Sequence, residues 1–217
     1  PNNLRFYYDG NPIKLVGRYT YLGIIFTSGG SFNETHKTLA GQAQKAIFRL
    51  RRYLYSFNNI SVEHTMSLFD KLVKPILFYG SEVWGFAQAN PIERIHTLFC
   101  KSVLGVKVST QNDFIYGELG RTNCQTQRLI YIIKFWLKIV NTKERKYVHC
   151  MYKTMLNDID RTPGKTNWAS LVKDLLSRLG FYTAWLAQGV GNIKVFVNLL
   201  KQRINDIFVQ EWNTRIN

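Results

Sequence analysis

The sequence predicts a mainly α fold, in which a short N-terminal antiparallel β element precedes a helical bundle and further C-terminal helices. Two observations predict it. Roughly the first 27 residues alternate in polarity and are rich in aromatic and β-branched types, whereas later apolar residues recur at three- and four-residue steps. The 217 residues are 46% hydrophobic with five prolines, a composition that excludes a largely disordered chain.

The N-terminal strands are predicted from side chains that alternate between two faces and from residues that favour a turn. Leu4, Phe6 and Tyr8 fall on one face of an extended segment. The run Asp9-Gly10-Asn11-Pro12 favours a chain reversal, because Gly and Asn accept a positive φ and proline fixes its own. A hairpin should therefore join Phe6–Tyr8 to Ile13–Val16. A third strand is predicted over Tyr19–Thr27.

The helices are predicted from apolar stripes and from start and stop signals. The first long helix carries the stripe Leu39, Ala43, Ile47, Leu50, Leu54 and Phe57. A second helix should begin near Ser61, a suitable N-cap, and Pro75 should kink or restart it. A third should open at Asn90-Pro91 and end near Gly105. Further helices are predicted at Gln125–Asn141, Glu144–Leu156, Trp168–Leu179 and Asn192–Trp212.

This pattern predicts three regions. Residues 1–30 form the strands, residues 31–88 a first set of helices, and residues 89–217 a C-terminal helical region. A seam is possible at residues 158–166, which are polar and contain Pro163-Gly164. The longest apolar stretch, Leu129–Val140, contains two lysines and is too short for a membrane span, so no transmembrane helix is predicted and no membrane is expected as the partner.

The charge of the chain predicts a polyanionic partner. Twenty-nine Lys and Arg face fourteen Asp and Glu, a formal charge of +15. Residues 35–74 carry seven basic and two acidic side chains, and residues 121–153 carry eight and one. Nucleic acid fits this concentration best, and an anionic membrane surface fits it less well.

Two basic rows are the candidate phosphate-binding residues. Lys45, Arg49 and Arg52 follow one another at i, i+4 and i+7 on the first long helix, and could track a phosphate backbone. The later helix offers a second row with aromatics between, where Tyr131 and Phe135 are more simply explained as core. The members of the second row that we expect to bind are Arg128, Lys134 and Lys138. A solvated helix face is the alternative for both rows.

Catalytic and metal motifs are weak. Two-metal polymerase chemistry needs clustered carboxylates, but the sequence has no Asp-Asp pair, and Asp158-Ile159-Asp160 is better explained as a solvated or capping segment. His96 and Cys100 stand at i, i+4, and His149-Cys150 and Cys124 could complete a zinc site if the fold joined them. Because no Cys-x-x-Cys spacing occurs, buried structural cysteines are favoured and no metal site is predicted.

Three cysteines cannot form a disulfide framework, which favours an intracellular location in nucleus or cytoplasm.

Three stretches carry a family resemblance. They are Tyr19-Thr20-Tyr21-Leu22-Gly23-Ile24, Gly41-Gln42-Ala43-Gln44-Lys45-Ala46 and the run LFDKLVKPILFYGSEVWG at residues 68–85. In this order they resemble the region downstream of the catalytic motif in reverse transcriptases of LINE-type, non-LTR retrotransposons. The resemblance is most specific over about residues 4–86. Gly117-Glu118-Leu119-Gly120 and Gln210-Glu211-Trp212 are similar to the C-terminal helices of that family.

The resemblance implies roles for several residues. Tyr21, Leu22 and Gly23 would belong to the primer grip at the end of a palm, and the helices from about Phe32 to Tyr79 would form a thumb. A glycine inside a strand also suggests close approach of another backbone, although a β-bulge is the commoner cause.

The resemblance also implies partners. The chain would grip an RNA template and a DNA primer. It would do so in association with the palm and fingers of the same polyprotein. Catalytic aspartates and Mg²⁺ would belong to that missing palm, so this chain alone is predicted to be inactive and to bind no cofactor. A non-catalytic helical module for nucleic acid or protein binding, a decayed remnant of such an element, is the alternative, and no oligomeric state is predicted.

Overall fold

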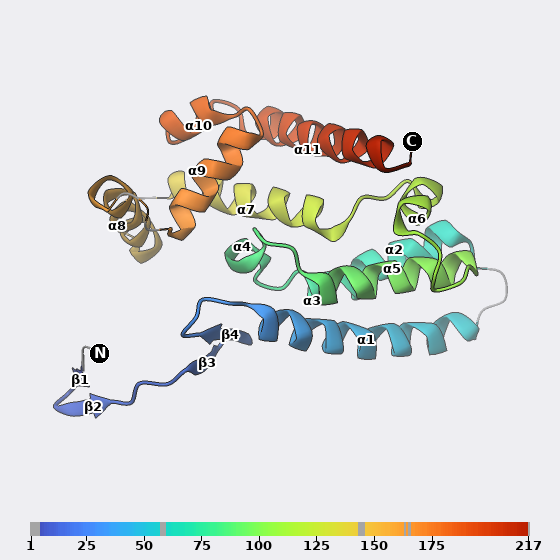
Figure 1. Ribbon diagram of the computed structural model, residues 1–217, viewed down its shortest axis with the longest axis horizontal. Coiled ribbons are helices and arrows are strands. Elements are labelled where there is room, and N and C mark those ends of the chain that lie inside the picture. The colour runs from blue at the N-terminus through green and yellow to red at the C-terminus, as the bar shows by residue number, and fades with distance from the viewer. Residues whose placement is uncertain (1–4, 57–59, 143–145, 163, 165, 217) are drawn as a thin grey trace.

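The computed structural model describes residues 5–56, 60–142, 146–162, 164 and 166–216. Four short strands at the N-terminus lead into a body of stacked helices (Figure 1). The predicted mainly α fold with a short N-terminal β element is confirmed. No helix among the described residues is both long and apolar enough to cross a membrane.

The strands form two separate antiparallel hairpins. Their bounds are Phe6–Tyr8 for β1, Asn11–Ile13 for β2, Arg18–Tyr21 for β3 and Ile24–Thr27 for β4. In the first hairpin Phe6 pairs with Ile13, and Asp9 and Gly10 turn the chain with φ of 49° and 75°. The predicted reversal is confirmed, but Asn11 and Pro12 lie in the second strand instead of the turn. Leu4 lies outside the described residues.

The predicted single strand Tyr19–Thr27 is wrong, because the chain reverses within it. Leu22 and Gly23 both have positive φ, 47° and 81°, and form the two-residue turn between β3 and β4. Two positive φ values in succession match the right-handed twist of paired strands. Gly23 is therefore required by a turn, and it lies neither in a strand interior nor at a bulge.

The helices follow the predicted start and stop signals closely. Ser61 caps the second helix by accepting the backbone N–H of His64, and Gly105 ends the third helix with a φ of 67°. The chain restarts at Pro75 as expected, since α2 ends at Leu72 and α3 begins one residue before the proline. The bounds are α1 Asn33–Tyr55, α2 Val62–Leu72, α3 Lys74–Leu77, α4 Ser81–Trp84, α5 Asn90–Leu104, α6 Asn112–Leu119, α7 Cys124–Val140, α8 Tyr147–Arg161, α9 Trp168–Arg178, α10 Tyr182–Leu186 and α11 Ile193–Ile216.

Several helical segments differ from the prediction. The sequence did not predict α4, α6 and α10, because elements of four to eight residues are too short to show a helical period. The possible seam at residues 158–166 begins inside α8, which continues to Arg161. Pro163 and Lys165 of that seam, Phe57 of the first stripe and Glu144 lie outside the described residues.

Most buried apolar residues form two clusters, one from residues up to Cys124 and one from residues after it. The first joins β4 to α1, α2, α3 and α5, with Phe69, Ile92 and Phe99 at its centre. The second is built by α7 to α11 around Trp136 and Leu200. Because α5 packs on α1 within the first cluster, the predicted boundary after residue 88 does not separate two cores.

The second hairpin is tied to α1 and the first extends away from the body. The buried Thr35 hydroxyl accepts the backbone N–H of Ile25 at 2.9 Å and donates to its carbonyl at 3.1 Å. In contrast, the residues of β1, β2 and β3 are exposed, including Tyr8 at 77% (Figure 1). Such exposed aromatic strands are typical of surfaces that another segment covers.

The C-terminal helix closes onto the first cluster. The Trp212 indole lies against Gly117, and its Nε1 donates to the Asp113 carbonyl at 2.7 Å. Arg215 pairs with the Asp113 carboxylate at 2.8 Å. The two segments that carried the weaker part of the family resemblance are therefore in direct contact.

We expect Gly117→Val to destabilise the fold by about 2 kcal/mol, because overpacking costs about 1–3 kcal/mol. A Cβ at this position would lie 2.8 Å from Trp212 Cζ2, and the indole is held by its hydrogen bond. The free energy of unfolding is measured by urea denaturation, with circular dichroism as the signal. Gly41→Val is the matched control, since nothing lies within 4 Å of a Cβ there. Equal midpoints for the two variants would contradict the packing role.

Candidate functional site

The cations of the first long helix lie together on its outer side. Lys45, Arg49 and Arg52 are all exposed. At about 100° per residue they fall within an arc of ~60°, opposite Ala43 and Ile47, which pack into the core. From Lys45 to Arg52 the helix rises ~10 Å, close to the axial rise of three nucleotides of one strand.

This row has no carboxylate partner among the residues that the structure describes. Glu34 is the one acidic residue of α1, and it pairs with Arg18 at 2.9 Å. The other ion pairs found in the described ranges involve Asp70, Glu93 and Asp113, all on different helices. The positive charge of the row is therefore available to an external anion.

The second predicted row is only partly exposed. Lys134 and Lys138 reach solvent from α7, but Arg128 is 1% exposed, so its predicted role in phosphate binding is wrong. Arg128 lies about 120° around the helix from Lys134, on the side that packs against α4. There its guanidinium carbon lies 5.5 Å from the Trp84 ring centre, and Nη2 donates to the Ala87 carbonyl at 3.2 Å.

Lys134 instead joins a groove that the sequence did not reveal. The groove has a volume of about 440 Å³, and its basic lining residues are Lys74, Arg121, Lys134 and Lys201. The Asp70 carboxylate partly neutralises this positive charge. It binds Arg121 through both oxygens, and one oxygen lies 3.8 Å from the Lys74 ammonium nitrogen. Burial and the nearby Arg121 lower the pKa of Lys74 from its ordinary value, with Asp70 acting in the opposite sense. These cations come from four separate segments, so no spacing rule could have joined them.

The predicted primer-grip residues form an exposed hairpin tip. Tyr21 and Leu22 are 57% and 71% exposed. Tyr79 fixes the tip, because its hydroxyl donates to the Leu22 carbonyl at 2.8 Å and its ring lies beside Gly23. The tip is thus positioned by the segment between α3 and α4.

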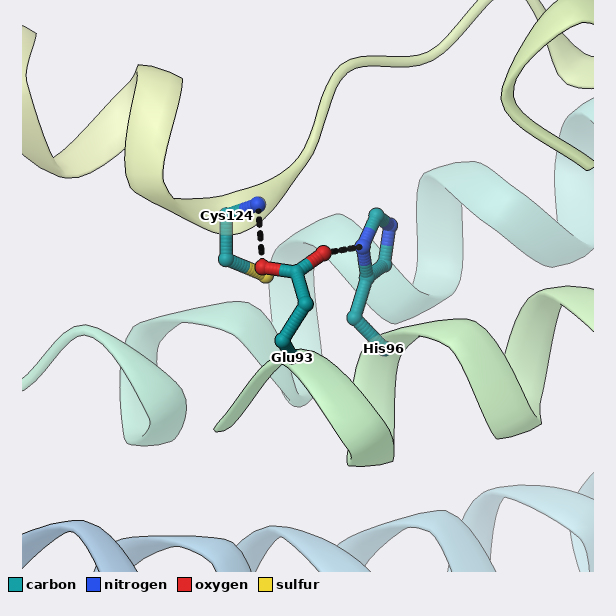
Figure 2. A group of neighbouring side chains, drawn as sticks. All are labelled: Glu93, His96 and Cys124. Atoms are coloured by element: carbon teal, nitrogen blue, oxygen red, sulfur yellow. Dashed lines mark hydrogen bonds and ion pairs between the residues drawn. The ribbon is translucent and has the colours of Figure 1, made fainter. Parts of the chain in front are cut away.

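A buried polar cluster lies where α5, α6 and α7 meet (Figure 2). One ligand atom from each of Glu93, His96 and Cys124 lies within 4.8 Å of the others. Glu93 is central, since its carboxylate accepts the Cys124 backbone N–H at 2.8 Å and the hydroxyl of Tyr116. His96 Nδ1 lies 3.6 Å from Glu93 Oε1, and this buried nitrogen has no hydrogen-bond partner.

The groups of this cluster shift one another's pKa values. Burial raises the pKa of the Glu93 carboxyl, but the nearby His96 and the hydrogen bonds from Tyr116 and Cys124 outweigh burial and hold it below its usual value. Burial lowers the pKa of His96, yet the neighbouring Cys124, Cys100 and Glu93 groups raise it well above its usual value. The sequence had paired His96 with Cys100 and Cys124, but it gave no signal for Glu93. Cys150 is exposed on α8 and does not belong to this group.

His36 is a buried histidine that packs against Trp84, apart from the Glu93 cluster. Its ring packs 4.7 Å from the Trp84 ring, and both of its nitrogens are buried without a hydrogen-bond partner. Burial, and then the charge of Arg128, lower the pKa of His36 to about 4. The imidazole is therefore neutral at pH 7.

Comparison of the chain with protein-family models, with curated proteins and with solved structures found no match. The family resemblance of the sequence motifs therefore stays a prediction.

We expect the buried, neutral His36 to make the fold acid-sensitive. The unfolded chain takes up a proton below pH ~6.5 and the folded chain only near pH 4, so stability is full above pH 6.5 and falls as pH drops between these values. The loss attributable to this residue is at most about 3 kcal/mol. Urea unfolding at pH 7.0, 5.5 and 4.5 measures it.

His36→Phe keeps an aromatic ring against Trp84 and removes the titrating group. Subtracting its pH profile from that of the natural chain isolates this residue from the carboxyl groups, which titrate in both proteins. Parallel profiles for the two proteins would contradict the assignment.

Proposed function

We propose that this chain is the thumb-like part of a LINE-type reverse transcriptase, and that it grips an RNA–DNA template–primer duplex through sequence-independent phosphate contacts. The observation that carries the proposal is the row of Lys45, Arg49 and Arg52, exposed on one side of α1 with no carboxylate partner among the described residues. Phosphate contacts of this kind fix a protein on a duplex without reading its sequence.

Gly41 supports contact at this face. A glycine inside a helix costs about 1 kcal/mol relative to alanine. Nothing in the described chain approaches a Cβ at Gly41, so internal packing does not account for it. Gly41 lies one turn before Lys45 on the same side of α1, where a missing side chain would let a sugar–phosphate backbone come close to the helix.

The groove beside α7 is a second place for the same ligand. Lys134 and Lys201 project into it without ion-pair partners in the described ranges, and Tyr131 adds an aromatic edge. A cationic groove with an aromatic side chain suits a phosphate backbone with an unpaired base.

The remaining parts of the proposed polymerase would cover the N-terminal hairpins. The chain has no Asp-Asp pair, and Asp158 and Asp160 lie two residues apart on α8, about 200° around the helix from each other. Metal-dependent nucleotide transfer therefore belongs, in this proposal, to a palm that packs against the exposed aromatic residues of β1 and β3.

We expect the triple variant Lys45→Ala, Arg49→Ala, Arg52→Ala to bind an RNA–DNA hybrid at least tenfold more weakly at moderate salt. Each lost phosphate contact should reduce the slope of log affinity against log salt by about 0.7–0.9. Fluorescence anisotropy with a labelled hybrid at several salt concentrations measures both quantities.

The matched control removes the same charge elsewhere. Arg161→Ala, Lys194→Ala, Arg203→Ala changes three exposed cations outside both basic surfaces. It should keep the salt slope and most of the affinity. Equal losses in the two triples would mean that net charge alone attracts the duplex. Binding of heparin and single strands as tightly as the hybrid would favour the non-catalytic module instead.

Gly41→Leu tests the close approach without changing charge. Leucine is the better helix former, so the melting temperature should stay the same or rise. Affinity for the hybrid should nevertheless fall several-fold, because the new side chain occupies the space next to Lys45. Unchanged affinity in a folded variant would show that no backbone packs against this position.

A further inference from the structure

The helix α5 presents three metal-ligating side chain types along one face. Glu93, His96 and Cys100 stand at i, i+3 and i+7, so they lie one above another. Cys124 comes from the first turn of α7, directly opposite (Figure 2). Four groups of the kind that bind zinc are thus gathered from two helices.

We infer that Glu93, His96, Cys100 and Cys124 form a structural Zn²⁺ site. The donor atoms of Glu93, His96 and Cys124 lie within 4.8 Å of one another. Zinc bonds of about 2.0–2.3 Å at tetrahedral angles place ligand atoms roughly 3.3–3.8 Å apart. Closing the cluster around an ion therefore needs shifts of about 1 Å, which side-chain rotations supply.

An unpartnered atom points to a ligand. His96 is 2% exposed, and its Nδ1 faces Glu93 without a hydrogen-bond partner. A buried polar atom in this condition is costly, and a coordinated ion would satisfy it. The fully buried thiol of Cys100 interacts with the same imidazole, but it lies outside the group of three within 4.8 Å and would have to move closer to serve as the fourth ligand.

The surroundings suit a closed zinc site. The Glu93 carboxylate is held by Tyr116 and by the Cys124 backbone N–H, as ligating carboxylates are in metalloproteins. Two thiolates, one carboxylate and Zn²⁺ would leave a formal charge of −1, and the buried guanidinium of Arg128 lies near Cys124 and Glu93 to balance it. Thiolate and imidazole ligands favour zinc over Mg²⁺ or Ca²⁺.

The proposed ion would join the two hydrophobic clusters. Cys100 and Cys124 both belong to the first cluster, and Cys124 is also the first residue of α7, the helix that carries the second cluster. Four protein ligands, of which His96, Cys100 and Cys124 are buried, would fill the coordination sphere of a tetrahedral ion, so the role is structural and independent of nucleic-acid binding.

The test is the metal content of the full chain. Protein purified from zinc-supplemented cells and dialysed against a weak chelator should retain about one zinc ion per chain by mass spectrometry. Cys124→Ser and Cys100→Ser should lose it. Cys150→Ser is the matched control, because Cys150 is exposed on α8, and it should keep the zinc. Equal zinc in Cys124→Ser and Cys150→Ser would overturn the inference.

A titration of the natural chain keeps the test decisive if the serine variants do not fold. Chain stripped of metal should gain an intense near-ultraviolet thiolate-to-cobalt absorption on addition of CoCl₂, and ZnCl₂ should displace it. Zinc should also raise the melting temperature, since an ion that binds only the folded state stabilises it. No thiolate–cobalt band and no shift in melting temperature would show a cluster held by hydrogen bonds alone.

Discussion

The Glu93 carboxylate is the contact on which the arrangement of the helices depends. It lies on α5 in the first hydrophobic cluster, and it accepts hydrogen bonds from Tyr116 on α6 and from the first residue of α7. It thereby satisfies an N–H at the start of α7 that no earlier turn of that helix could satisfy. Because α7 carries the second cluster, the direction in which that cluster leaves the first is set at this buried group.

The position of α7 in turn places the basic groove. Its outer side contributes Lys134 to the groove that also contains Lys74 of α3 and Lys201 of α11, helices that pack into the first and the second cluster respectively. Arg128, on the inner side of the same helix, packs against Trp84 and keeps its charge inside the molecule. Two cations of one helix thus lie in different environments, Lys134 at the surface and Arg128 inside the molecule.

Local features of the fold could be predicted from the sequence, whereas long-range ones could not. Helical spacing sets which side of α1 a residue faces, so the buried side from Leu39 to Leu54 and the shared exposed side of the three cations could be predicted, whereas the phosphate-binding role of those cations stays a prediction. The turn at Leu22-Gly23 was missed because leucine with a positive φ is uncommon and resembles a strand residue in sequence. Arg128 was misplaced because spacing gives angles around a helix but not the direction of the neighbouring helix.

The buried cluster shows the same limit. His96, Cys100 and Cys124 could be named from their residue types, but Glu93 resembles any acidic residue in the first turn of a helix. Its partners Tyr116 and Cys124 follow 23 and 31 residues later in the chain, and only the packing of three helices brings them to it.

The contact of Trp212 with α6 has a consequence for how the chain is made. Its indole bonds to a carbonyl 99 residues earlier, while the first cluster is complete once Cys124 has been synthesised. On the ribosome the first cluster can therefore assemble before α11 has left the exit tunnel. Until α11 has emerged, the small surface of α6 around Gly117, which the indole later covers, stays exposed.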